Sequence, residues 1–221
     1  MRATRPPSGT IDRMTVPGRV EAASLLLSLD PRPWFVQHAR AVAEVAAFLA
    51  ARTEAAGIGV DRRLAEAAAL LHDVDKALPA GDPARRLAHG DGSAAWLTRH
   101  GHPELARAVA GHSVTRLVDG DGFERWMTTA TAEDLIVAYA DKRAGQRLGT
   151  LDDRFGSWLR RHPERVVDGR REGWDEDTWL AVRARAGRLE SEVCAAAGIA
   201  PEAVRRLAWT ESALRRARAS R

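Results

Sequence analysis

The stretch AEAAALLHDVDKA, residues 65–77, decides how the rest of the chain is interpreted. Its Ala and Leu residues recur with a helical period and predict a buried helix face. That face ends on an imidazole and a carboxylate, His72 and Asp73. A buried carboxylate needs a cation, a network of hydrogen bonds or a proton. The stretch therefore predicts a helix that ends at a chemical site.

The rest of the chain follows the same helical period without alternating β patterns, so we expect an all-α fold. Helices are expected over residues 21–29, 33–56, 61–77, 83–88, 92–99, 102–113, 151–161, 175–197 and 201–219. Thr131 and Asp134 form a capping box that begins a further helix in TAEDLIVAYADKRAG. The Gly- and Asp-rich segment 118–127 is expected to be a loop.

Composition points to a soluble globular protein, with 45% hydrophobic and 29% charged residues in 221 positions. Of the 34 basic residues 32 are Arg, which suits anionic small molecules as well as it suits RNA. Apart from the last residues, LRRARASR, no basic block predicts a nucleic-acid partner. The single cysteine, Cys194, excludes a disulfide framework and a CxxC metal site. Neither a signal peptide nor a membrane span is evident, so we expect a cytoplasmic protein without a membrane partner. An oligomer is compatible with the sequence.

Four predicted helices each place one metal-capable group on the face that should point into the core. The apolar stripes are Val42, Val45 and Leu49 for His38; Ala65, Ala68 and Ala69 for His72; Leu105, Ala108 and Val109 for His112; and Val137 and Ala138 for Asp141. Any one of these histidines alone is more simply a hydrogen-bonded core residue, and Asp73 alone could cap a helix or pair with Arg. Four coincident faces favour a metal site with nitrogen and oxygen ligands, which suits Fe, Mn, Co, Ni or Mg.

The order His38, His72-Asp73 and Asp141 resembles the HD-domain superfamily of metal-dependent phosphohydrolases. LLHDVDK resembles the LLHDIGK-type core of that family, with an aspartate, the second of the stretch, in place of the usual glycine. RLAHGDGSAAWL and ARAVAGHS resemble the two-metal subset, and in particular bacterial HD-type diadenosine tetraphosphate (symmetrical) hydrolases. The resemblance covers roughly residues 30–160, although the segment after Asp141, DKRAGQRLGTLDDRF, differs from theirs.

This resemblance implies an HD-domain helical bundle that binds two divalent ions per chain, with Asp73 as a catalytic residue that bridges them. The implied ligands are His38, His72, Asp73, His89, His112 and Asp141. The implied reaction is hydrolysis of a nucleotide phosphoester or phosphoanhydride by metal-activated water that attacks phosphorus in line. A diadenosine polyphosphate is the leading substrate, and a nucleoside monophosphate or an alarmone comes next.

The chain has only two lysines, Lys76 and Lys142, and each lies within three residues of an implied ligand. We predict that Lys76 holds a phosphate oxygen and neutralises developing charge as a second catalytic residue. Lys142, Arg143 and Arg147 are predicted to bind substrate as well. The alternative is that chance alone placed the lysines there.

Two other classes of function fit the sequence. Some members of the superfamily with the same six ligands are di-iron oxygenases, whose iron redox cycle consumes oxygen. A non-catalytic, metal-stabilised module that binds nucleotide or RNA is the other, with the Arg-rich segment VRRLAWTESALRRARASR as its contact surface. In the simpler alternative that segment is an amphipathic helix with Val204, Leu207 and Leu214 packed inward.

The chain is expected to divide into three parts. Residues 1–20 should be disordered or loosely ordered, residues 21–167 should form the HD domain, and residues 168–221 should form a C-terminal helical extension. The stretch DGRREGWDEDTW, residues 168–179, is the candidate linker. The remaining histidines, His100, His102 and His162, are expected at the surface or at helix ends.

Overall fold

The computed structural model describes residues 16–161, 163–167 and 170–220. In this part of the chain the α-helices are α1 (Arg19–Ser28), α2 (Pro33–Ala55), α3 (Arg62–Leu71), α4 (Asp91–Arg99), α5 (Ala106–Gly111), α6 (Gly120–Thr129), α7 (Ala132–Arg143), α8 (Leu151–Arg161), α9 (Glu176–Ala196) and α10 (Trp209–Ala219). Short 3-10 helices are η1 (Val74–Ala77), η2 (Pro83–Arg86), η3 (Pro103–Leu105), η4 (Val114–Leu117) and η5 (Pro201–Ala203). The predicted all-α fold is confirmed, with one addition: β1 (Arg165–Val167) and β2 (Arg170–Glu172) form a small antiparallel hairpin.

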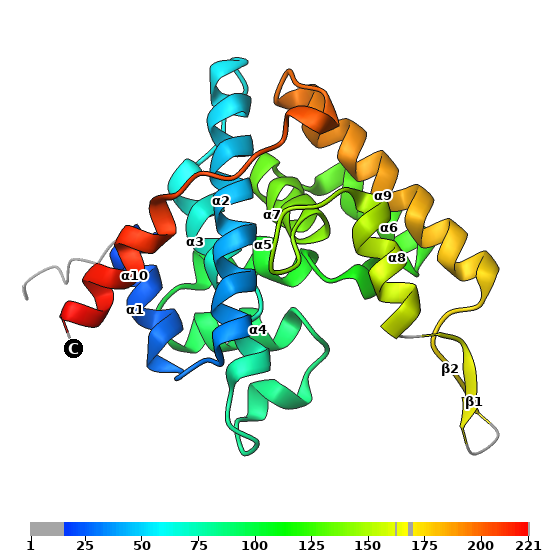
Figure 1. Cartoon of the computed structure of the whole chain (residues 1–221), viewed down its shortest axis with the longest axis horizontal. Coiled ribbons are helices and arrows are strands. Elements are labelled where there is room, and N and C mark those ends of the chain that lie inside the picture. Colours follow the sequence, from blue (N-terminus) through cyan, green and yellow to red (C-terminus); the bar gives the residue numbers. More distant parts are fainter. Residues whose placement is uncertain (1–15, 162, 168–169, 221) are drawn as a thin grey trace, which may run out of the picture.

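Helix α2 lies at the centre of the molecule (Figure 1), and α3 and α7 pack against it. Helix α5 packs in turn against α7 and α3. A helix that is apolar nearly all round belongs in the interior, and most of the α2 side chains are buried. The four expected apolar stripes are confirmed, because every member of them is at most 1% exposed. These four helices therefore direct their polar ends into one interior space.

Helix α3 is shorter than expected, and its early end creates the site. The helix begins at Asp61, whose carboxylate accepts the backbone N–H groups of Arg63 and Leu64, and it ends at Leu71 rather than at residue 77. Asp73 lies between α3 and η1 at φ −105° and ψ 15°, the bridge region that helical residues avoid. The change of direction turns His72 and Asp73 toward the same space.

Two segments differ from the helices and loops that the sequence predicts. Residues 120–129 form helix α6 rather than a loop, since the Asp119 carboxylate accepts the N–H of Gly122 and caps the helix. Residues 201–219 are not one helix, because the chain is extended at Val204 before α10 begins. The capping box of Thr131 and Asp134 at the start of α7 is confirmed.

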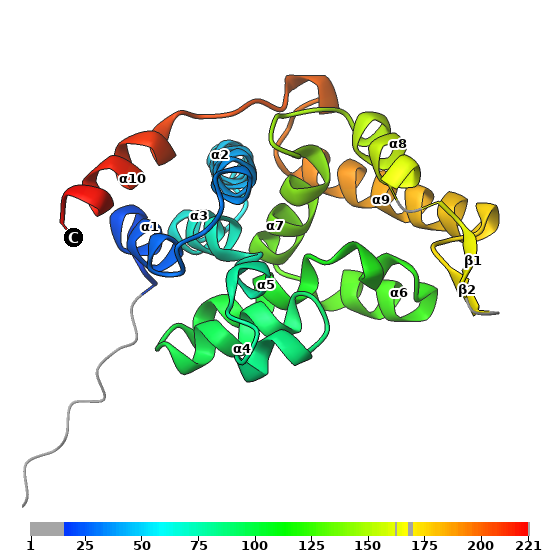
Figure 2. The same cartoon turned by 60° about the horizontal axis from the view of Figure 1, so that its bottom comes forward.

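The two ends of the described chain meet beside α2. Helices α1 and α10 lie side by side (Figures 1 and 2). Glu44, buried on α2, accepts a hydrogen bond of 2.6 Å from Arg206 Nε and another from the Thr210 hydroxyl. A buried carboxylate that is satisfied in this way fixes the C-terminal segment to the core. Val204 and Leu214 are packed there as expected for the apolar alternative, and Leu207 is partly buried.

Residues that follow the region of resemblance, roughly residues 30–160, pack against that region and are not separated from it by a linker. Helix α9 packs along α7, and Tyr139 of α7 donates a hydrogen bond of 2.6 Å to Glu190 of α9. Strand β2 and the start of α9 occupy the stretch that was expected to be a linker. The sequence did not predict the strands, because three residues are too few to show an alternating pattern. Helix α1 begins at Arg19, and residues 1–15 of the expected disordered segment lie outside the described residues. The division into domains stays a prediction.

None of the described helices combines the length and the apolar character needed to cross a bilayer.

Candidate metal centre

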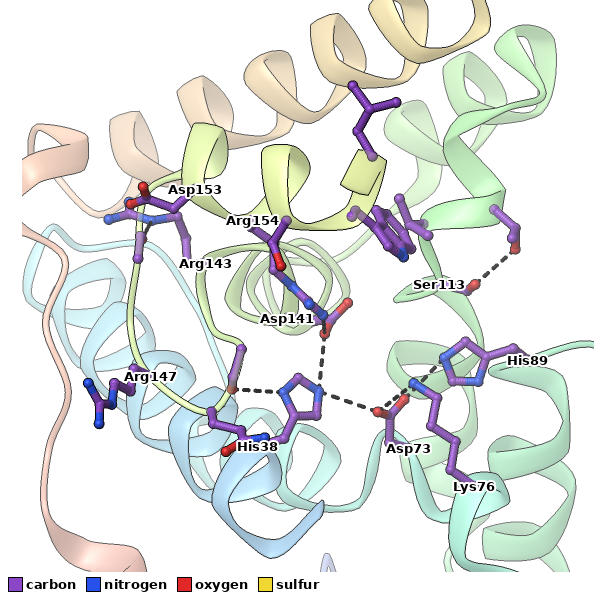
Figure 3. A pocket seen from close by; sticks show the side chains of 18 of the residues that line it. His38, Asp73, Lys76, His89, Ser113, Asp141, Arg143, Arg147, Asp153 and Arg154 are labelled. Atoms are coloured by element: carbon purple, nitrogen blue, oxygen red, sulfur yellow. Dashed lines mark hydrogen bonds and ion pairs between the residues drawn. The ribbon is translucent and has the colours of Figure 1, made fainter. Parts of the chain in front are cut away.

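Six side chains that are far apart in the sequence converge beside a cavity of about 1180 Å³. They are His38 of α2, His72 and Asp73 after α3, His89 before α4, His112 after α5 and Asp141 in the last turn of α7. Figure 3 shows four of them, His38, Asp73, His89 and Asp141, directed toward one another. The other two, His72 and His112, are fully buried. The six side chains that the sequence singled out therefore lie close together, and their role as metal ligands stays a prediction.

The first cluster consists of His38, His72, Asp141 and the Oδ2 oxygen of Asp73. The Nε2 atoms of His38 and His72 are 3.1 Å apart, and the Nε2 atom of His38 lies 3.3 Å from both Asp73 Oδ2 and Asp141 Oδ1. His72 Nε2 lies 3.5 Å from Asp73 Oδ2 and 3.7 Å from Asp141 Oδ1. Four potential ligand atoms thus surround one point.

The second cluster consists of His89, His112 and the Oδ1 oxygen of Asp73. The Nε2 atoms of the two imidazoles are 3.2 Å apart, and they lie 3.1 Å and 3.3 Å from Asp73 Oδ1. The two oxygens of one buried carboxylate therefore face two different pairs of histidines.

Each histidine is held by its other ring nitrogen. Carbonyl oxygens only accept hydrogen bonds, so Nδ1 of His38 must donate to Gly145 O, at 3.0 Å, and Nδ1 of His72 to Ala69 O, at 2.8 Å. His112 donates in the same way to Val109 O, three residues earlier. His72 and His112 each follow the last residue of a helix, where carbonyls lack helical partners. These Nδ1 hydrogen bonds leave Nε2 as the atom that faces the cluster, as is usual for metal-binding histidines.

The pKa values of the histidines reflect both their burial and the carboxylates beside them. Burial lowers the pKa of His38, but hydrogen bonds to Asp141 and Asp73 outweigh it and raise that pKa to about 9. The pKa of His89 is likewise raised to about 9, by Asp73 and Asp75 against the effect of burial. Burial lowers the pKa of His112 to about 4, so this imidazole stays neutral.

The two carboxylates keep their charge in spite of their burial. Burial by itself would raise the pKa of Asp73, yet the surrounding imidazoles, His72 foremost, hold it well below its usual range. Against the same effect of burial, hydrogen bonds to His38 and His72 hold the pKa of Asp141 well below its usual range. Ionised carboxylates in the interior require cations beside them.

The spacing of these side chains suits metal ligands. Two ligands that bind one ion at right angles, with bonds of about 2.1 Å, lie about 3 Å apart, close to the spacing of both histidine pairs. Asp73 Oδ1 is buried without a hydrogen bond, a state that costs free energy unless a cation satisfies it. Potential ligand atoms of these residues form overlapping groups within 4.8 Å of one another.

Asp75, which replaces the glycine of the family-like core, supports the second cluster. Its Oδ2 oxygen accepts a hydrogen bond of 2.8 Å from His89 Nδ1 and one of 3.2 Å from the Gly90 backbone. Gly90 has φ +91°, and a Cβ there would lie 3.1 Å from Ala110 O, so glycine suits this turn. Asp75 is part of the stretch that decided the sequence analysis, but the helical periodicity does not connect it with His89.

The predicted substrate-binding residues separate into two groups. Lys76 and Arg147 line the cavity, and Lys76 Nζ lies 2.7 Å from Asp73 Oδ2 while its side chain remains 43% exposed. Lys142 instead points into the core, where it donates to His112 O at 2.7 Å and to Ala138 O at 3.1 Å. Burial lowers the pKa of Lys142 to about 8. The prediction that Lys142 contacts substrate is therefore withdrawn.

Arg143 has a structural role as well. Its guanidinium is buried and donates to Gly149 O, at 2.7 Å, and to the Tyr139 hydroxyl, at 2.6 Å. These bonds hold the loop 144–149, whose Gly145 carbonyl orients His38. Arg143 therefore supports the loop that orients a histidine of the first cluster, and because it also lines the cavity its contact with substrate stays a prediction.

Arg154 is a cavity residue that the sequence did not single out. It belongs to α8, and its Nη2 atom lies 3.6 Å from Asp141 Oδ1. It was one arginine among 32, and only the packing of α8 beside α7 brings it to the centre.

Two of the histidines that were expected outside the site lie at helix ends, as predicted. His100 follows α4 and stacks on Trp96, with ring centroids 3.9 Å apart. His102 directly precedes η3 and is buried, and its Nδ1 lies 3.4 Å from a Glu104 oxygen. His162 lies outside the described residues.

Comparison with known proteins gives one match. The family model described as HD domain matches residues 35–145, half of the chain and all six residues of the two clusters. No curated protein and no solved structure matches.

Proposed function

The chain belongs to the HD domain family, and from that premise we propose that it uses two divalent metal ions to hydrolyse a phosphoester or phosphoanhydride of a nucleotide. HD domains are in general metal-dependent hydrolases that bind divalent ions, and the clustered His and Asp side chains are suited to hold them. The observation that supports two ions is the buried carboxylate of Asp73, whose two oxygens face two separate pairs of imidazoles.

In this proposal the chain supplies ligands and a positive charge. Bound divalent ions lower the pKa of water and draw charge from phosphoryl oxygens. Asp73 would hold both ions, one at each oxygen, and the Nδ1 contacts keep the imidazoles in the required orientation. Lys76 places its ammonium beside Asp73 at the cavity wall, where it can donate a hydrogen bond to a phosphoryl oxygen and offset charge in the transition state. Fe, Mn, Co, Ni and Mg are all compatible with these ligands.

The cavity favours a large anionic substrate. Its volume of about 1180 Å³ exceeds the usual range for small-molecule sites, about 300–1,000 Å³. Lys76, Arg147 and Arg154 line it, which suits several phosphate groups. We therefore place a diadenosine polyphosphate first and a nucleoside monophosphate or an alarmone next.

A di-iron oxygenase would use the same six ligands, so the two activities need a direct test. Purified protein should be analysed for metal and then loaded with each candidate ion and offered a panel of nucleotides. The proposal predicts nucleotide-dependent release of phosphate or of a mononucleotide without oxygen consumption. A chain with two bound ions that hydrolyses no nucleotide, and whose iron form consumes oxygen, would contradict it.

Metal affinity should rise with pH. Without metal, His38 and His89 keep their protons up to about pH 9, and a metal ion must displace them. We therefore expect tighter binding as the pH rises toward 9 and little further change above it. Calorimetric titration with Mn²⁺ in buffers of different ionisation enthalpy measures both the affinity and the protons released. An affinity that does not depend on pH below 9 would contradict these protonation states.

Replacing Asp75 by Asn should weaken the second cluster alone. The variant loses the negative charge that orients His89, and the loss of such an outer contact typically costs 10- to 100-fold in metal affinity. Titration with Mn²⁺ should therefore show one weakened site and one unchanged site. Asp82→Asn, which alters a partly buried carboxylate that pairs with Arg99, is the matched control. Equal weakening of both sites would show that Asp75 does not act through His89.

A further inference from the structure

Tryptophan is concentrated around the cavity of the metal centre. Aromatic residues make up only 5% of the chain, and seven of them are Trp. Four of these seven, Trp34, Trp158, Trp174 and Trp179, line this one cavity. Large aromatic side chains in the wall of a polar, charged cavity are not needed for metal binding, so they call for another explanation.

Three of these tryptophans form a group, the tryptophan cluster, made of Trp158, Trp174 and Trp179. Trp158 belongs to α8, Trp174 follows the hairpin and Trp179 lies in the first turns of α9. The rings of Trp158 and Trp174 meet edge to face, with centroids 5.3 Å apart at 70°. All three side chains are only partly buried, so the cavity has access to ring surface.

The tryptophan cluster is connected to the metal centre through one arginine. Arg154 lies one helical turn before Trp158 on α8, and its guanidinium carbon is 5.9 Å from the centre of that ring. The same guanidinium lies 3.6 Å from Asp141 of the first cluster. A ligand that reaches from the ions past Arg154 therefore meets an aromatic surface.

The backbone beside Trp174 has a conformation that favours glycine at position 173. Gly173 has φ +83°, which favours glycine, and a Cβ there would lie 2.7 Å from Pro163 O. This close approach ties the segment after the hairpin to the segment that follows α8. Gly173, Trp174 and Trp179, which all belong to the stretch that was expected to be a linker, thus line the cavity.

We infer that the tryptophan cluster is a stacking subsite for the nucleobase of the substrate; the inference rests on the proposed function of the same cavity. Indole faces stack on any planar base, and a neighbouring guanidinium adds a cation–π contact. Stacking depends on ring area more than on hydrogen bonds, so the subsite holds purines more tightly than pyrimidines and discriminates little between adenine and guanine. The metal clusters and Lys76 bind the phosphate, and the tryptophan cluster binds the ring.

The test compares two probes that each contain half of a nucleotide. Adenosine has the ring without phosphate, and ribose 5-phosphate has the phosphate without the ring. Binding of each is measured by calorimetry to the full chain loaded with Mn²⁺. We expect Trp158→Leu and Trp174→Leu to weaken adenosine about tenfold and to leave ribose 5-phosphate unchanged within about twofold. Trp174→Phe keeps a ring and should retain most of the adenosine affinity.

Trp126→Leu is the control, because this partly buried tryptophan on α6 does not line the cavity. Adenosine affinity that is unaffected by the cavity variants, or an equal loss for both probes, would overturn the inference. If one Leu variant fails to fold, the other Leu variant decides the case. Loss of adenosine binding in the Trp variants of a chain that hydrolyses no nucleotide would support the subsite while refuting the proposed hydrolase activity.

Discussion

Asp73→Asn is expected to release both metal ions and to lower nucleotide hydrolysis by at least about 1,000-fold. Asp73 is 1% exposed, and its two oxygens lie within 3.3 Å of histidines from both clusters. An amide keeps the shape but loses the negative charge and one of the two oxygen ligands. Loss of several kcal/mol of charge stabilisation corresponds to a rate effect of about this size. Elemental analysis of metal per chain and kcat/KM measure the two effects.

Two further variants make this result specific. Asp152→Asn changes a carboxylate that is 84% exposed and pairs with Arg183, so both metal content and activity should stay unchanged. His89→Ala should remove one ion and leave the other. If Asp73→Asn kept both ions, or if His89→Ala kept the full metal content, the assignment of two bridged ions would be wrong.

Lys76→Met should lower turnover about 100-fold while metal content stays the same. The ammonium lies 2.7 Å from Asp73 Oδ2, but a lysine is not a metal ligand, so its loss removes charge from the cavity and not an ion. Removing one preorganised electrostatic contact to a transition state typically costs 10²–10³ in kcat. Steady-state kinetics and metal analysis of the same preparation test both parts of the prediction.

Lys76→Arg is the matched variant, because it keeps the positive charge and changes only the geometry of the head group. We expect it to recover part of the lost turnover, since a planar guanidinium and a compact ammonium are not equivalent. Turnover of Lys76→Met close to that of the original chain would exclude a catalytic role. Loss of metal from Lys76→Met would mean that the lysine acts through Asp73 instead.

Much of the fold and the inward direction of the candidate ligands could be predicted because each helix repeats the same simple pattern. His38 and Asp141 share faces with residues that are fully buried, so the 3.6-residue period alone directs them inward. The early end of α3 could not be predicted in this way. Its apolar stripe runs to Leu71, and the change to a 3-10 helix at Val74 is decided by contacts with other segments, such as the bond from Asp75 N to Ser93 Oγ.

The sequence could not show which charged side chains turn toward the cavity. Lys142 and Lys76 both stand near an aspartate in the sequence, yet one donates to core carbonyls and the other faces the cavity. The difference arises from the packing of α7 against α5, which no local pattern encodes. Trp174 is a similar case, because only the fold of the hairpin segment brings it to the cavity that holds His38.

The central claim is that Asp73 bridges two divalent ions held by the first and second clusters. The most direct measurement is the anomalous diffraction of crystals of the Mn²⁺-loaded chain. We predict two anomalous peaks about 3.5–4 Å apart, one beside His38, His72 and Asp141 and the other beside His89 and His112, with an Asp73 oxygen at each. A single peak, or a map with no peak in which Asp73 and Asp141 pair with guanidinium groups, would contradict the claim.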